Sequence, residues 1–67
     1  MHKPRFIRLP DVITKTGLRR STIYERMAEG TFPTAINLGG RSVAWIETEV
    51  DDWMLSQIEK SRLAGVR

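Results

Sequence analysis

The chain contains no cysteine and a single histidine, His2, among its 67 residues. Without cysteine, neither a disulfide bond nor a thiolate zinc site can support a small core. The usual combinations of nucleophile, base and metal ligand are missing, and so is a glycine-rich phosphate loop. We therefore expect no enzymatic activity, no metal and no cofactor. Ser21 and Ser42 are better explained as a helix cap and a hairpin residue than as nucleophiles.

Long apolar runs are also absent. No run approaches the roughly 20 residues that a membrane-spanning helix requires, and residues 1–4 lack the apolar stretch of a secretory signal. We expect a cytoplasmic protein that binds neither membranes nor a small-molecule ligand. The length of 67 residues is enough for one small domain. We place it at residues 5–60, with flexible tails at 1–4 and 61–67.

The net charge of +3 is distributed unevenly along the chain. Residues 1–45 hold eight Lys and Arg against three Asp and Glu, whereas residues 46–67 hold three bases and five acids. A basic front half is expected of a protein that turns one face to phosphate. The charge by itself is equally compatible with an ordinary solvated surface.

Residues 17–26 read as a glycine turn followed by a short helix that opens with two arginines. Pro10 and Asp11 predict the start of a first helix that runs to about Thr16, and Gly17 can end it in the left-handed conformation. A second helix is predicted over residues 20–29. Two short helices joined by a glycine turn are typical of a helix-turn-helix.

The first helix is expected to bury one apolar side, supplied by Phe6, Leu9, Val12, Ile13 and Leu18. In the second helix, Ile23 and Met27 share the predicted buried side, and Gly30 and Pro33 mark its end. The residues then predicted to face a DNA groove are Ser21, Glu25 and Ala28, with Thr22 and Tyr24 on the flanks.

The start of the second helix has two interpretations that differ by one residue. Ser21 is a favourable N-cap. Alternatively, Thr22 and Glu25 have the spacing of a capping box.

Residues 35–38 and 43–46 are two short alternating runs on either side of Gly39, Gly40, Arg41 and Ser42, which predicts a hairpin. A four-residue loop pairs Leu38 with Val43 and Ile36 with Trp45, and it turns one apolar face to the core. Arg41 then lies at the tip, as on the wing of a winged helix-turn-helix. The other interpretation is a hairpin that only covers the core.

A last helix is predicted from Glu47 or Thr48 to about Lys60. Its core stripe comprises Ile46, Val50, Trp53, Met54 and Ile58. Four acids at its start, Glu47, Glu49, Asp51 and Asp52, do not share one face. They therefore fit the helix dipole better than a metal site.

Several motifs occur in a specific order. They are Arg8-Leu9 through Gly17-Leu18, Ser21-Thr22-Ile23-Tyr24, Gly30-Thr31-Phe32-Pro33, Leu38-Gly39-Gly40-Arg41-Ser42-Val43, and Trp45 through Glu49-Val50-Asp51-Asp52-Trp53. With this series, residues 5 to about 58 resemble the AlpA family of small phage and prophage regulators. The resemblance implies a mainly α winged helix-turn-helix, with three helices and a two-stranded wing. It also implies binding to promoter or attachment-site DNA, as in excisionases and MerR-type regulators, and control of integrase expression or of excision.

The chain departs from the family pattern at two positions. Arg19 stands where a serine is expected as the recognition-helix cap, which adds charge. Glu25 stands where an arginine often follows the Ser-Thr-Ile-Tyr motif, which removes an expected phosphate contact and bears on the sequence that is read.

These observations predict a sequence-specific regulator that binds double-stranded DNA. The expected contact residues are Arg19, Arg20, Ser21, Thr22, Tyr24, Glu25 and Arg26 on or beside the recognition helix, and Arg41 and Ser42 on the wing. One alternative is an architectural excision factor that bends attachment-site DNA, with further copies of the protein beside it. An alternative of another class is a module that docks on integrase or polymerase through the acidic last helix. RNA binding is disfavoured, because the usual aromatic stacking platform is missing.

Overall fold

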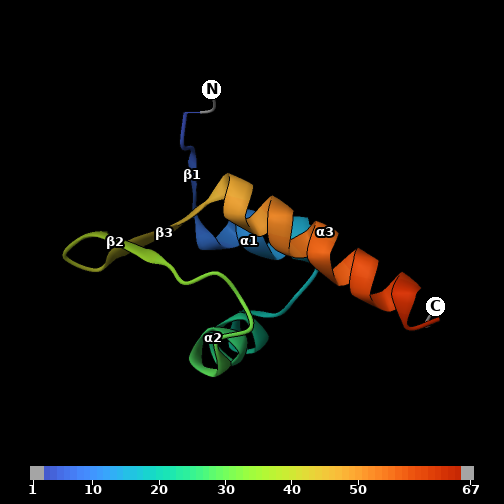
Figure 1. Ribbon diagram of the computed structural model, residues 1–67. Coiled ribbons are helices and arrows are strands. Elements are labelled where there is room, and N and C mark those ends of the chain that lie inside the picture. Colours follow the sequence, from blue (N-terminus) through green and yellow to red (C-terminus); the bar gives the residue numbers. More distant parts are fainter. Residues whose placement is uncertain (1–2, 66–67) are drawn as a thin grey trace.

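The protein is a winged helix-turn-helix in the computed structural model, which describes residues 3–65 (Figure 1). The fold consists of three helices and a small antiparallel sheet. In order, the elements are β1 (Phe6–Ile7), α1 (Leu9–Thr16), α2 (Arg20–Glu29), β2 (Ile36–Gly39), β3 (Ser42–Ile46) and α3 (Glu47–Leu63). His2 and the outer ends of the predicted tails, residues 1–2 and 66–67, lie outside the described residues.

Helices α1 and α2 are joined by the predicted glycine turn. Gly17 has a φ of +73°, and its N–H donates a hydrogen bond to the carbonyl oxygen of Ile13 at 2.8 Å. The N–H of Leu18 then donates to the Thr16 hydroxyl at 3.2 Å. The bounds predicted for α2 are confirmed, and α1 begins at Leu9, one residue before Pro10.

Strand β1 was not predicted, and it changes the sheet from two strands to three. It pairs antiparallel with β3, Phe6 opposite Ile46 and Ile7 opposite Trp45, so that β3 is the central strand. Neighbouring residues of a strand point to opposite faces. Ile7 is therefore buried, whereas Phe6 is 51% exposed, and the prediction that Phe6 belongs to the core is wrong.

The register predicted for the hairpin is also wrong. Ile36 lies opposite Ala44 and Asn37 opposite Val43, with a two-residue turn at Gly40 and Arg41. An irregularity between Asn37 and Gly39 explains the difference, because the Asn37 side-chain oxygen accepts the N–H of Gly39 at 2.8 Å and bends the strand locally. As a result β2 does not turn an apolar face to the core: Ile36 is exposed, and so is Leu38 at 44%.

The core lies between the helices and the central strand. Its buried residues are Ile7, Val12, Ile23, Phe32, Ala44, Trp45 and Val50. Phe32 was not among the predicted core residues, and it is 4% exposed. The Phe32 ring packs edge-on against Trp53, with 4.8 Å between the ring centres, and the Trp53 indole N–H donates to the Thr31 carbonyl at 2.7 Å.

Helix α3 begins at Glu47, one of the two predicted starts, and continues to Leu63, three residues beyond the predicted end. Val50 is buried, and Ile46, Trp53 and Met54 are partly buried, as predicted. Ile58 is 44% exposed, so its assignment to the core stripe is wrong. No helix within residues 3–65 is long and apolar enough to cross a membrane.

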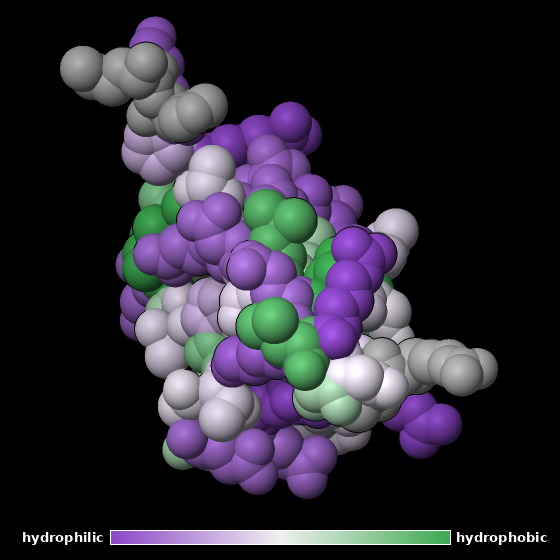
Figure 2. Space-filling model, turned by 45° about the vertical axis from the view of Figure 1, so that its right-hand side comes forward, coloured by the Kyte–Doolittle hydropathy of each residue, from purple (hydrophilic) through white to green (hydrophobic). Residues whose placement is uncertain are grey.

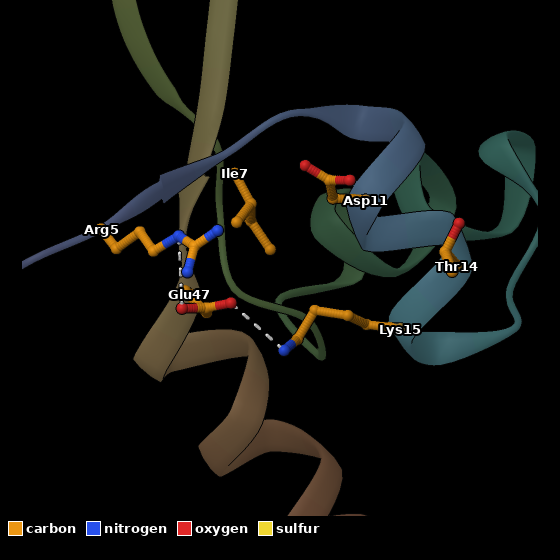
Figure 3. Close-up of a pocket in the computed structure, with 6 residues that line it drawn as sticks. All are labelled: Arg5, Ile7, Asp11, Thr14, Lys15 and Glu47. Atoms are coloured by element: carbon orange, nitrogen blue, oxygen red, sulfur yellow. Dashed lines mark hydrogen bonds and ion pairs between the residues drawn. The ribbon is translucent and has the colours of Figure 1, made fainter.

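A cluster of ion pairs joins Arg5, which precedes β1, to α1 and α3. The Lys15 ammonium lies 2.9 Å from an Asp51 oxygen and 3.4 Å from a Glu47 oxygen, and Arg5 approaches Glu47 at 3.8 Å. Figure 3 shows Arg5 and Lys15 on two sides of Glu47, in a small surface hollow that is also lined by Ile7, Asp11 and Thr14. No group of acids and histidines in the described part of the chain is arranged to hold a metal ion. Of the four acids at the start of α3, Glu47 and Asp51 form ion pairs.

The turn conformation predicts the effect of a substitution at Gly17. A Cβ added at this residue meets nothing within 4 Å, so the cost arises from the positive φ alone. We expect Gly17→Val to lower the free energy of unfolding by about 1 to 3 kcal/mol in urea denaturation. Gly17→Asn is the matched control, because asparagine tolerates this conformation and should lose much less. An unchanged urea midpoint for the valine variant would contradict this explanation.

The ion-pair cluster predicts a dependence of stability on pH. The hydrogen bond to Asp51, supported by the charge of Asp51 and by Glu47, raises the pKa of Lys15 above its ordinary value of 10.5 despite the opposing effect of desolvation. The charged lysine therefore stabilises the fold below about pH 10.5, and this contribution is lost as the pH rises through the folded-state pKa.

The measurement is the difference in unfolding free energy between the wild type and Lys15→Met, followed from neutral to strongly alkaline pH. It should be constant near neutrality and shrink above the ordinary lysine pKa. Lys60→Met serves as the control, since Lys60 forms no ion pair within residues 3–65. A Lys15→Met difference that stays constant to the highest pH would show that the cluster does not act in this way.

Candidate nucleic-acid interface

The outer face of α2 is formed by the residues that the helical periodicity predicted. Ile23 is fully buried and Met27 partly buried on the inner side. Ser21, Glu25 and Ala28 are exposed on the other side of the helix. This prediction is confirmed. Helix α2 lies at one edge of the molecule (Figure 1).

The N-cap of α2 differs from both interpretations. The helix begins at Arg20, and the N-cap is Arg19, in an extended conformation and without a side-chain cap hydrogen bond. The Arg19 carbonyl accepts the N–H of Ile23 at 3.0 Å, which closes the first turn two residues earlier than a Ser21 cap would. Thr22 and Glu25 therefore lie inside the helix, and the capping box is not formed.

Arg20, Tyr24 and Trp45 contact one another in a series that leads from the surface to the core. The guanidinium carbon of Arg20 lies 5.8 Å from the centre of the Tyr24 ring, within the range of a cation–π contact. The Tyr24 ring meets Trp45 edge-on, with 6.3 Å between the ring centres. Trp45 is fully buried, and its indole N–H donates to the Pro33 carbonyl at 3.1 Å. The two exposed side chains are thus supported by the core.

The positioning role of Trp45 was not predicted from the sequence. A lone tryptophan at the end of an alternating run indicates burial, and nothing in its local pattern shows which helix it contacts. The partnership with Tyr24 joins residues 21 positions apart and arises only from the packing of α2 on the sheet.

Arg26 and Thr22 lie on the flank of α2, and both are partly buried. The Arg26 carbonyl accepts the N–H of Thr31 at 2.9 Å and its hydroxyl at 3.2 Å, so the backbone at the end of α2 is well held. Its side-chain Nε is buried and has no hydrogen-bond partner among the described residues. The guanidinium also takes part in no ion pair within residues 3–65.

Arg41 and Ser42 lie on a separate element, the tip of the hairpin formed by β2 and β3. Gly40 occupies the first turn position with a φ of +56°, and Arg41 follows it, exposed to solvent. Ser42 is partly buried and pairs with Gly39. The hairpin projects from the body of the molecule. Its tip and the C-terminal end of α3 lie on opposite sides of the molecule (Figure 1).

The charges of the interface remain available to an anionic partner. Within residues 3–65, the ion pairs involve Arg5, Lys15, Glu47 and Asp51. None of the arginines predicted to contact DNA takes part in one; these are Arg19, Arg20, Arg26 and Arg41. The surface around α2 and the hairpin tip can therefore attract phosphate without first breaking an internal pair.

The chain is similar in sequence to phage and prophage proteins. The family model described as "Prophage CP4-57 regulatory protein (AlpA)" matches residues 5–58. An "Uncharacterized protein ORF88" of Enterobacteria phage P4 is 50% identical over 54 residues, which cover 81% of this chain and 61% of that protein. The "DNA-binding transcriptional activator AlpA" of Escherichia coli strain K12 is 46% identical over 56 residues, covering 75% of this chain and 80% of that protein. This chain thus spans less than two thirds of the phage P4 relative.

Proposed function

Since the chain belongs to the AlpA family of prophage regulatory proteins, we propose that it is a transcriptional regulator that binds specific sequences of double-stranded DNA. The observation that carries this proposal is the exposed polar face of α2, which opens with arginines and is supported from the core through Tyr24 and Trp45. A helix of this kind, with arginines at its N-terminal end, fits the width of the major groove of B-DNA.

In the proposed complex, the N-terminal end of α2 approaches a phosphate. No side chain caps the first turn, so its backbone N–H groups can bind an anion together with Arg19 and Arg20. Ser21 and Glu25 then face the base edges, with Thr22, Tyr24 and Arg26 on the flanks. Phosphate contacts position the helix, and the groove-facing side chains select the sequence.

The hairpin forms a second contact in this proposal. Arg41 lies at its tip and Ser42 beside it, where the backbone of the glycine turn can come close to the DNA. An arginine at this position binds phosphate from a separate element, which lengthens the contact along the duplex.

The proposed targets are promoter or attachment-site DNA of a phage or prophage, and the proposed outcome is control of integrase expression or of excision. An architectural excision factor differs from a transcriptional regulator in bending its site and in binding as several adjacent copies. A gel-mobility bending assay on selected sites distinguishes the two roles.

The proposal is tested by selecting bound fragments of genomic DNA and then measuring affinity by fluorescence anisotropy over a range of salt concentrations. Phosphate binding releases counterions, so the affinity should fall steeply and linearly on a logarithmic plot against salt. Failure to select any sequence, together with affinity for a protein partner that does not depend on salt, would instead favour an interaction module.

Arg41→Ala tests the contact at the hairpin tip. The variant should bind specific and random duplexes more weakly by similar factors and reduce the salt slope by about one unit, since a phosphate contact carries no direct sequence information. Lys60→Ala removes an exposed base from α3 and should leave both quantities nearly unchanged. If Arg41→Ala keeps full affinity at low salt, the hairpin only covers the core.

Glu25→Gln tests base selection. Because Glu25 is the sixth residue of α2 and forms no cap, we expect the variant to keep its thermal stability. A carboxylate can accept a hydrogen bond from cytosine N4 and is repelled by phosphate, so the variant should bind random DNA at least as well. It should also lose a preference of about 1 to 3 kcal/mol at one base position.

Glu29→Gln is the matched control, since it removes the same charge from the last residue of α2. It should leave the selected sequences unchanged. A selection profile for Glu25→Gln that equals the wild-type profile at every position would refute the proposed reading role.

A further inference from the structure

Four side chains of α3 form an exposed line that the core does not use. Asp51, Leu55, Ile58 and Arg62 are separated by four, three and four residues, which places them on one face of the helix. Leu55 is 59% and Ile58 44% exposed, Asp51 is partly exposed, and Arg62 is exposed. We call these four residues the α3 stripe. It consists of an acid, two apolar residues and a base.

We propose that the α3 stripe binds the same stripe of a second copy of the protein, with the two helices antiparallel. A two-fold axis midway between Leu55 and Ile58 places Leu55 of each copy against Ile58 of the other. The same axis places Asp51 of each copy against Arg62 of the other. Such an interface is self-complementary, as two-fold symmetry requires.

The charges of the stripe favour a second copy in this orientation. Asp51 precedes the apolar pair by four residues, and Arg62 follows it by four, so an antiparallel pairing brings opposite charges together at both ends. A parallel pairing would set like charges against each other. Arg62 forms no ion pair among the described residues, and the contact of Asp51 with Lys15 uses one carboxylate oxygen.

The small size of the stripe predicts weak association in free solution. A stable complex usually buries about 800 Å² on each partner, and four side chains provide much less. On the face drawn in Figure 2, hydrophobic side chains lie singly or in small groups among hydrophilic ones, without one continuous apolar surface. Copies bound side by side on DNA have a far higher effective concentration, so pairing should then produce cooperative binding. This last step depends on the proposed function, whereas the pairing itself does not.

The test is sedimentation equilibrium of the full chain without DNA, from micromolar to millimolar concentrations. We expect a reversible monomer–dimer equilibrium. Leu55→Ser should raise its dissociation constant at least about tenfold, because each dimer loses two apolar contacts. The matched control is Leu63→Ser, which removes a leucine that is 87% exposed on α3 but lies off the stripe. This control should associate like the wild type.

Charge reversal supplies a second readout that a loss of folding cannot imitate. Arg62→Glu should weaken association, because two acids then meet at each end of the interface. Adding Asp51→Lys should restore it, since the charges are then exchanged and again complementary. Circular dichroism at each step verifies that the variants remain folded.

Three results would overturn the proposal: a wild type that stays monomeric at every concentration, an equal effect of Leu63→Ser and Leu55→Ser, or a folded double reversal that does not regain association. Because no DNA is present, these failures would leave the proposed DNA binding untouched. A protein that pairs but selects no DNA would contradict the proposed function alone.

Discussion

Burial of the Trp45 indole in the central strand connects the parts of the candidate DNA-binding surface. A buried indole requires a partner for its N–H, and the Pro33 carbonyl provides it, which holds the loop between α2 and the hairpin. The same ring supports Tyr24, and through it Arg20. Helix α2 and the loop therefore both contact Trp45, which is part of the hairpin. These contacts position the polar face of α2 relative to the sheet.

The charges of the chain are divided between internal pairing and external exposure. Glu47 and Asp51 on α3 are paired with Arg5 and Lys15. These pairs are partly exposed, so each contributes little to stability, but they neutralise acids that would otherwise repel phosphate. The arginines of α2 and the hairpin have no such partners within residues 3–65. These arginines of the basic front half are thus free of ion pairs in the described part of the chain, and Glu25 and Glu29 also lie on α2.

Helix α3 is longer than the core requires. Its first half packs through Val50 and Trp53, whereas Leu55 and Ile58 face solvent. A small domain can bury only a limited fraction of its apolar surface, and the remainder is available to another molecule. The proposed self-association through this face and the proposed DNA binding through α2 use different elements, so neither would displace the other.

The sequence by itself determined the features that depend on nearby residues. Gly17 and Gly30 end helices because both adopt a positive φ, and the spacing of Ile23 and Met27 predicts which face of α2 is buried. The candidate site on that face could therefore be predicted, including the exposed positions of Ser21 and Glu25. Whether these residues contact DNA remains a prediction.

Tertiary structure decided the features that depend on distant partners. Strand β1 is too short to show an alternating pattern, and it forms because β3 offers a free edge to Phe6 and Ile7. The hairpin register depends on how one side-chain hydrogen bond of Asn37 bends β2. The contact of Tyr24 with Trp45 exists only after α2 has packed on the sheet. Local periodicity contains no information about such pairings, because it describes one element at a time.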